Sequence, residues 1–176
     1  MNGNFIKISA LEKGRSKIEL IELTSDSSLV GETRNLLSEY GHYMYGDLAF
    51  VAGKERFFRE LVYFPGPAYL PPSGTFIAAK VGNEVAGCAG IRKFDENSCE
   101  MKRMYIRPVH RGKGIGALLC NYVIAWCRKS AYSRILLDSN KEMEAAVALY
   151  HKCGFTDIQP YCINENENPV FMEYVL

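Results

Sequence analysis

A short basic loop with alternating glycines is the part of this sequence best suited to bind a charged ligand. It follows a predicted strand, begins a predicted helix and reads R-G-K-G-I-G. Its residues are Arg111, Gly112, Lys113, Gly114, Ile115 and Gly116. The glycines let successive backbone N–H groups point into one concavity, and the helix adds its positive N-terminal end. With the charges of Arg111 and Lys113, the loop is a compact site for a pyrophosphate.

Two better-known phosphate-binding motifs fit this loop badly. A nucleotide P-loop, G-x-x-x-x-G-K-[ST], requires Ser or Thr after the Gly-Lys pair, where this sequence has Gly114. A dinucleotide-binding fingerprint belongs near the start of a chain and needs an acidic residue about 20 positions further on, and neither condition is met. A basic turn before a core helix is the remaining alternative to phosphate binding.

The spacing of apolar residues predicts the elements that position the loop. Alternation between apolar and polar residues predicts the first strand, and apolar runs between turn signals predict the others. The predicted strands span residues 17–24, 75–81, 84–92, 99–107, 134–138, 155–159 and 170–175. Apolar residues at helical spacing predict helices at 29–45, 53–62, 114–129 and 142–152. The stretch 64–74 is rich in proline and glycine, which predicts a loop.

The order of these elements predicts a mixed sheet. The helix between strands 99–107 and 134–138 implies a parallel pair with a right-handed crossover, whereas the strands before it form an antiparallel meander. We therefore predict an α/β fold, or α+β in stricter terms, with a mostly antiparallel sheet of about seven strands and helices on both faces. It forms a single domain over residues 1–176, in which residues 1–16 are a flexible or peripheral segment.

Composition excludes several classes of function. The 176 residues are 48% apolar and 23% charged, the ordinary range of a folded domain. With a net charge of only +1, the protein is not expected to have the broad positive surface of a nucleic-acid binder. Residues 1–16 contain no apolar core of signal-peptide length, and the longest charge-free apolar stretch, 114–127, is too short to span a bilayer. We therefore expect a cytoplasmic protein with reduced cysteines. The six cysteines include no C-x-x-C pair and the three histidines are scattered, so we expect no metal.

The loop and a later segment together resemble the GNAT (Gcn5-related N-acetyltransferase) superfamily. R-G-K-G-I-G is similar to the family motif Q/R-x-x-G-x-G/A, with Arg111, Gly114 and Gly116 at the motif positions. Residues 146–155, A-V-A-L-Y-H-K-C-G-F, resemble the second family signature, A-x-x-L-Y-x-x-x-G-F. The order of elements matches the family from about residue 17 onward, which is nearly the whole chain. The end of the chain is similar to a bacterial subgroup whose substrates are unassigned.

The resemblance implies that acetyl-CoA is the acyl donor. In the family, the strand before the glycine loop splays from the next parallel strand, and the pantetheine arm of acetyl-CoA lies in the gap. The arm forms hydrogen bonds to the backbone of the strand before the loop, as an additional strand would. The matching residues here are Met104, Tyr105 and Ile106, with the backbone of Met104 and Ile106 as the expected partners. The loop from Arg111 to Gly116 would bind the pyrophosphate.

Many family members also bind the pantetheine through an asparagine. Asn140 follows the predicted strand 134–138 and is our candidate for this contact. Alignment on Tyr150, however, places Met143 at the usual asparagine position, so a contact from Asn140 would follow a different path. A turn residue that caps the helix near Glu142 is the alternative role for Asn140.

The resemblance further implies a reaction, the transfer of an acetyl group to a primary amine of a small molecule or protein by direct attack. The attacking amine must be neutral, so a base must accept its proton. Glu100, eleven residues before Arg111, matches the base in the histone-acetylating branch of the family. An exposed strand carboxylate paired with Lys102, with a bound water as base, is the alternative. Tyr150 matches the residue that protonates the departing CoA thiolate, and the backbone N–H of Met104 is the expected oxyanion donor. A core tyrosine bonded to a backbone group is the alternative for Tyr150.

A non-catalytic CoA-binding module, acting as a sensor or structural partner on the same fold, is the alternative to an N-acetyltransferase. Such a module keeps the glycine loop but needs neither Glu100 nor Tyr150. The expected partner of the enzyme is its amine acceptor, and the aromatic-rich segment 40–69 matches the helices and loop that wall the acceptor site in the family. We expect no nucleic-acid or membrane partner, and a homodimer stays open.

Overall fold

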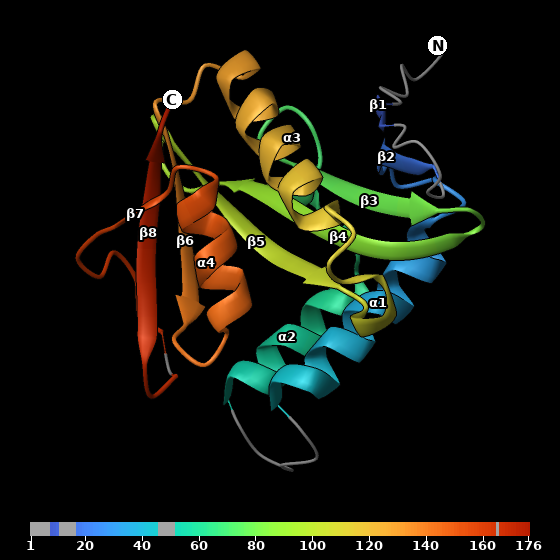
Figure 1. Cartoon of the computed structure of the whole chain (residues 1–176), viewed down its shortest axis with the longest axis horizontal. Helices are drawn as coiled ribbons and strands as arrows, with labels where there is room; N and C mark the ends of the chain where they lie inside the picture. Colours follow the sequence, from blue (N-terminus) through green and yellow to red (C-terminus); the bar gives the residue numbers. More distant parts are fainter. Residues whose placement is uncertain (1–7, 11–16, 46–51, 165) are drawn as a thin grey trace.

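Figure 1 shows the computed structural model of the protein, which describes residues 8–10, 17–45, 52–164 and 166–176. The described strands are β1 (Ile8–Ala10), β2 (Ile18–Glu22), β3 (Thr75–Val81), β4 (Glu84–Lys93), β5 (Ser98–Ile106), β6 (Arg134–Asn140), β7 (Thr156–Asp157) and β8 (Pro169–Val175). The α-helices are α1 (Val30–Tyr45), α2 (Ala52–Val62), α3 (Ile115–Lys129) and α4 (Glu144–Lys152). Short 3₁₀ turns span Pro67–Tyr69 and Pro108–His110.

The strands form one eight-stranded sheet in the order β1-β2-β3-β4-β5-β6-β8-β7. The β5–β6 pair is parallel and the other pairs are antiparallel. The predicted mixed fold is therefore confirmed, including the crossover by α3. β1 pairs with β2 at the sheet edge, within the N-terminal segment predicted to be peripheral. The rest of that segment and residues 46–51 lie outside the described residues.

Two elements after α3 differ in length from their predictions. The strand predicted at 155–159 is only the two-residue β7. The helix predicted from 142 begins at Glu144, because the chain turns first after β6. In that turn the Met143 N–H donates to the Asn140 carbonyl oxygen at 3.0 Å, and the Glu142 N–H donates to Asn140 Oδ1 at 3.2 Å.

Alternate residues of the central strands face two separate cores. On β3, Ile77 and Ala79 belong to the core shared with α3 and α4, whereas Phe76 and Ala78 belong to the core shared with α1 and α2. Since side chains of a strand alternate between its two faces, a strand covered on both faces is apolar throughout. Helices therefore cover both faces of the sheet, as predicted, and α3 and α4 lie in front of it in Figure 1. No helix in the described part of the chain is both long and apolar enough to cross a bilayer.

β5 and β6 separate after a short paired stretch. Their parallel pairing ends at Glu100 and Leu136, and the two strands then diverge (Figure 1). A β-bulge accompanies the divergence. Lys102 pairs with Gly90 of β4 and Tyr105 pairs with Cys88, so three residues of advance along β5 match only two along β4. Arg103 lies in this bulge, and its φ of 58° is in the left-handed region that residues other than glycine rarely adopt. One edge of β5 is therefore left open beyond Glu100.

The open end of β5 depends on a close approach to β4 at Gly87. An added Cβ there would lie 2.9 Å from the Tyr105 carbonyl oxygen and 3.0 Å from Ile106 Cγ1. We expect Gly87→Ala to lower the free energy of unfolding by about 1–3 kcal/mol, as overpacking does, in denaturant unfolding experiments. Gly31→Ala is the control, because a Cβ at this position of α1 meets nothing within 4 Å and is expected to stabilise by up to about 1 kcal/mol. Equal stability of the two variants would contradict the close packing at Gly87.

Candidate active site

The glycine loop leads directly into α3. Gly112 and Gly114 have φ values of 73° and 83°, a left-handed backbone that glycine adopts without steric cost. Gly114 is the N-cap of α3 and adds no side-chain cap, and the Leu118 N–H donates to its carbonyl oxygen at 3.1 Å. The N–H groups of residues 115–117 precede this first helical bond, so they are available to an anion beside the exposed Lys113.

Arg111 is engaged with the end of β5. Its Nε donates to the Ile106 carbonyl oxygen at 3.1 Å. Its guanidinium lies over the rings of Tyr43 and Tyr105, 5.3 and 5.9 Å from their centroids. Arg111 therefore fastens the loop to the strand, and the predicted phosphate contact would require it to leave these partners. Lys113 is the loop cation that has no such contact with the described residues to give up.

The backbone of β5 is open at the residues predicted to bind pantetheine. The Arg107 N–H donates to the Ala86 carbonyl oxygen at 2.9 Å, toward β4. Because neighbouring residues of a strand direct their backbone groups to opposite edges, Met104 and Ile106 direct theirs away from β4 and into the opening. Tyr105, between them, is buried. The geometry thus presents the two expected backbone partners on one edge.

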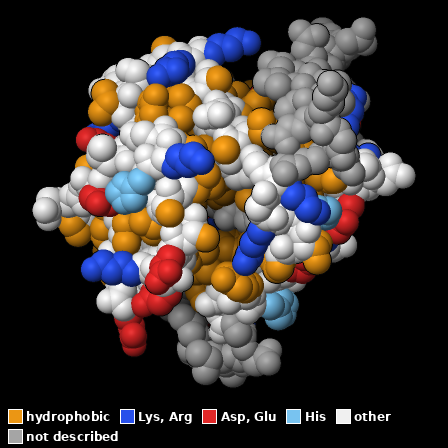
Figure 2. Space-filling model, in the orientation of Figure 1, with side chains coloured by type: hydrophobic (Ala, Val, Ile, Leu, Met, Phe, Trp, Pro, Cys, Tyr) orange, Lys and Arg blue, Asp and Glu red, His pale blue; other side chains and the backbone are white. Residues whose placement is uncertain are grey.

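Figure 2 shows the same face of the molecule as a surface that is hollowed over β5, between α4 and the start of α3. Apolar side chains surround this hollow, and Lys and Arg side chains stand beside it. The open strand edge and the start of α3 are therefore reached from one side of the molecule.

Tyr150 lies on α4, in the core that α3 and α4 share with the sheet. Its side chain is only 7% exposed. Burial raises the pKa of its hydroxyl well above the ordinary value, so the group stays protonated near neutral pH. Within the described part of the chain, this hydroxyl has no hydrogen-bond partner, whereas the core-tyrosine alternative requires a backbone partner. Its role as an acid stays a prediction.

Asn140 occupies the turn between β6 and α4. Its amide oxygen accepts the bond from Glu142, which is the turn role given above as the alternative. Met143 is the N-cap of α4 and is partly buried. A pantetheine contact from Asn140 stays a prediction.

Glu100 is buried within a cluster of charged side chains. Its Oε2 accepts hydrogen bonds from Nε and Nη2 of Arg92, both at 2.7 Å. Its Oε1 accepts a hydrogen bond from the Tyr161 hydroxyl at 2.9 Å and lies 3.3 Å from Lys102 Nζ. Glu100 is therefore not an exposed strand carboxylate, although the pairing with Lys102 is present. Both carboxylate oxygens of Glu100, the predicted base, are therefore already engaged with partners.

Two further members of this cluster, Asp138 and Asn164, were not found from the sequence. Lys102 Nζ lies 2.5 Å from Asp138 Oδ1, and Asn164 Nδ2 donates to Asp138 Oδ2 at 2.9 Å. Burial by itself lowers the pKa of Lys102, but the Asp138 and Glu100 carboxylates outweigh it and hold that pKa above its ordinary value. A sequence signal existed, because Asp138 follows the apolar run 135–137 toward the carboxyl end of a parallel strand, where ligand sites commonly form.

Three groups of the cluster have the spacing of metal ligands. The ligand atoms of Glu100, Asp138 and Cys162 all lie within 4.8 Å of one another. The Lys102 ammonium contacts both carboxylates, however, and already supplies the positive charge that a metal ion would bring. These residues therefore suit an ion-pair cluster better than a metal site.

Helices α1 and α2 lie against the same end of β5. Arg103 pairs with Glu60 of α2 at 2.5 Å, and its guanidinium lies 4.4 Å from the centroid of the Phe57 ring. Tyr40 of α1 packs on Tyr105, with 5.1 Å between the ring centroids. The aromatic-rich segment thus borders the opening, where the resemblance places the acceptor wall.

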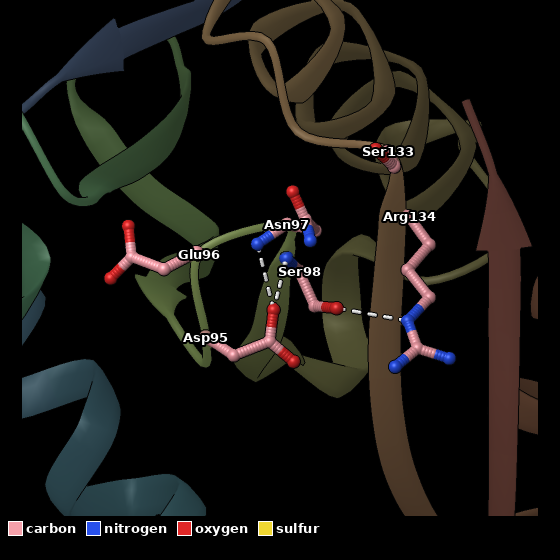
Figure 3. Close-up of a pocket in the computed structure, with 6 residues that line it drawn as sticks. All are labelled: Asp95, Glu96, Asn97, Ser98, Ser133 and Arg134. Atoms are coloured by element: carbon pink, nitrogen blue, oxygen red, sulfur yellow. Dashed lines mark hydrogen bonds between the residues drawn. The ribbon is translucent and has the colours of Figure 1, made fainter.

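A second hollow lies at the opposite ends of β5 and β6 (Figure 3). It is lined by Asp95, Glu96, Asn97, Ser98, Ser133 and Arg134. Asp95 Oδ1 accepts bonds from the N–H groups of Asn97 and Ser98 at 2.8 and 2.7 Å. Arg134 Nε donates to Ser98 Oγ at 2.8 Å. These bonds stabilise the turn before β5, and none of the predicted site residues lies there.

Comparison with known proteins agrees with this geometry. An uncharacterized N-acetyltransferase of Schizosaccharomyces pombe is 37% identical over 110 residues, which are 61% of this chain and 68% of that protein. A GNAT-family acetyltransferase structure from Staphylococcus aureus Mu50 has a TM-score of 0.71 at 21% identity, over 90% of this chain and 98% of the other. A GNAT-family structure from Elizabethkingia anophelis with acetyl-CoA bound has a TM-score of 0.62 at 20% identity, over 93% and 100%.

Sequence similarity over most of the chain decides the family. The profile of the acetyltransferase (GNAT) family matches residues 32–155. That match contains the loop 111–116, the open end of β5 and the signature 146–155. This chain therefore belongs to the GNAT family of acetyltransferases.

Proposed function

We propose that this protein transfers the acetyl group of acetyl-CoA to a primary amine of a small molecule or protein, by direct attack of the amine on the thioester. The observation that most supports this is the open edge of β5 beside the uncapped N-terminus of α3. A pantetheine arm carries amides that can pair with such an edge, and a pyrophosphate suits such a helix end. The related Elizabethkingia anophelis structure contains acetyl-CoA, which agrees with this assignment.

The proposed binding contacts of the donor involve two groups of backbone atoms: the edge of β5 that β6 leaves, where the Ile106 carbonyl oxygen already accepts a bond from Arg111 Nε, and the start of α3. The pantetheine amides would bond to the backbone of Met104 and Ile106. The pyrophosphate would accept bonds from the loop at 112–114 and from the N–H groups of residues 115–117, beside the Lys113 charge. The protein has a net charge of only +1, so attraction for the anionic donor must come from this local site.

The chemistry requires one group that accepts a proton from the amine and one that donates a proton to the thiolate. Tyr150 is our candidate donor, because its phenol is held protonated and has no partner within the described residues. The charged cluster around Glu100 supplies the candidate acceptor. A CoA-binding module without turnover, the alternative function, needs neither an unpartnered phenol nor a carboxylate in the opening.

Our first functional prediction concerns the loop. Acetyl-CoA is expected to raise the melting temperature, by a stabilisation of about 2.7 kcal/mol at 100 times its Kd, and 3′-dephospho-CoA is expected to retain most of this effect. Gly114→Ala should abolish most of the shift, because a Cβ strains the left-handed backbone that sets the start of α3. Differential scanning fluorimetry measures both effects.

The matched control for the loop variant is Gly82→Ala. Gly82 also has a left-handed φ, 61°, and open space around its Cβ position, but it lies in the β3–β4 hairpin. This variant should be strained to a similar extent and still respond to acetyl-CoA. The loop assignment is wrong if Gly114→Ala responds to acetyl-CoA as fully as Gly82→Ala does.

Tyr150→Phe tests the proposed acid. The variant should lose roughly 10²-fold in kcat, the lower part of the range for general acid catalysis. Its melting temperature and its acetyl-CoA affinity should change little, because the hydroxyl has no bond to lose. Tyr132→Phe is the control. It removes the hydrogen bond from the Tyr132 hydroxyl to the Ser73 carbonyl oxygen, and it should lower the free energy of unfolding by about 1 kcal/mol with normal turnover. Normal turnover with lowered stability in Tyr150→Phe would place Tyr150 in the core alone.

A further inference from the structure

Two carboxylates, rather than one, lie where β5 and β6 begin to diverge. Glu100 is the last residue of β5 that pairs with β6. Asp138 lies two residues beyond Leu136, the last residue of β6 that pairs with β5. Lys102 contacts both of them, at 3.3 and 2.5 Å. If the protein acetylates amines, as proposed above, one of the two is the better acceptor for the proton of the amine.

Glu100 has no capacity left for a substrate. An ionised carboxylate offers about four lone-pair positions. Arg92 occupies two of them at 2.7 Å each, Tyr161 takes a third at 2.9 Å and Lys102 the fourth at 3.3 Å. The Glu100 side chain is only 2% exposed. An amine or a water could bond to Glu100 only by displacing one of these partners.

Asp138 retains that capacity. Among the described residues, Lys102 contacts its Oδ1 and Asn164 donates to its Oδ2, which leaves about two of four lone-pair positions. Its side chain is 14% exposed, compared with 2% for Glu100. Asp138 is therefore both more exposed than Glu100 and less fully hydrogen-bonded by the described residues.

The charge of Asp138 also acts on tyrosines that border the opening between β5 and β6. Burial is the main cause of the raised pKa values of Tyr40 and Tyr150, and the Asp138 charge adds to both. The charge of Glu100 acts on Arg92, Lys102 and Tyr161, and that of Asp138 acts on the last two as well. Asp138 is thus the carboxylate whose charge reaches Tyr40 on α1 and Tyr150 on α4, on two sides of the opening.

We propose that Asp138 accepts the proton of the acceptor amine, directly or through one water, and that Glu100 is a positioning residue. Asp138 first accepts a proton from the bound ammonium; as the resulting neutral amine bonds to the acetyl carbon and the carbon–sulfur bond breaks, the surplus nitrogen proton passes to solvent and the Tyr150 proton passes to sulfur. Solvent then removes the proton from Asp138 and restores that of Tyr150, so the products are an amide and a free thiol. Glu100 holds Lys102 between the strands, and Lys102 in turn positions Asp138 through their ion pair.

The test compares Asp138→Asn with Glu100→Gln as a function of pH. An amine that the wild type acetylates is first identified by thiol release, and kcat/KM is then measured from below to above its pKa. Asp138→Asn should lose about 10²–10³-fold at low pH, and the loss should shrink as the free amine becomes abundant. Its melting shift with acetyl-CoA should persist.

Glu100→Gln should instead give a pH profile parallel to the wild type, with a lowered melting temperature because Arg92 loses its ionic partner. Asp157→Asn is the control, as this carboxylate on β7 is 66% exposed, and its profile should match the wild type. The charged and titratable groups that face Asp138 are Lys102, Glu100, Tyr40, Tyr150, Tyr161 and Cys162. Asp138→Asn also removes the charge that raises the pKa values of Lys102 and Tyr150, so Asp138→Glu, which restores that charge, is measured beside it.

Several outcomes would overturn the proposal. A parallel profile for Asp138→Asn with a pH-dependent loss for Glu100→Gln assigns the proton to Glu100, and two parallel profiles assign it to a water. If Asp138→Asn does not fold, Asp138→Glu keeps a carboxylate and must retain the wild-type shape of the profile at reduced kcat. A wild type that binds acetyl-CoA but acetylates no amine refutes the proposed function instead, which separates the two failures.

Discussion

The brief pairing of β5 with β6 is the constraint on which the rest of this structure depends. Parallel strands joined by a crossover helix gain hydrogen bonds wherever they pair, yet this pair stops at Glu100 and Leu136. β6 keeps its other edge fully paired with β8, down to Asn140 and Pro169, so β6 remains in the sheet. The bulge at Arg103 accompanies the departure of β5. Backbone groups left open in this way are costly unless water or a ligand satisfies them, which explains why a peptide-like donor suits the opening.

The same divergence explains the charged cluster. A closed sheet would fill the space between the strands with apolar side chains, whereas the opening holds Lys102 between Glu100 and Asp138. Charges in such a place persist only when they are paired, and removing one partner of a buried pair typically costs about 3–5 kcal/mol. Tyr161 and Asn164 complete the pairing from the segment after β7. The C-terminal part of the chain is therefore a component of the site as well as an edge of the sheet.

The opening joins groups from both cores. Tyr150 belongs to the core of α3 and α4, while Tyr40 and Tyr105 belong to the core of α1 and α2 or pack against it. Arg111 links the glycine loop to the Ile106 carbonyl and to the rings of Tyr43 and Tyr105. Binding of a donor along β5 would thus contact elements on both faces of the sheet.

Local patterns in the sequence were sufficient to predict most of the elements and to propose a donor site. The glycines of residues 112–116 require a particular backbone, the alternation along β3 requires a strand covered on two faces, and both features depend on neighbouring residues alone. The partners of side chains depend instead on strand register and on the path of distant segments. Lys102 meets Asp138 across 36 positions and Tyr161 meets Glu100 across 61, so only the tertiary structure could show that the predicted base is saturated. The sequence by itself determined which residues form the strands and the glycine loop, whereas the folded chain decided which carboxylate keeps lone pairs that no described residue occupies, because hydrogen-bond capacity is a property of the neighbours in space.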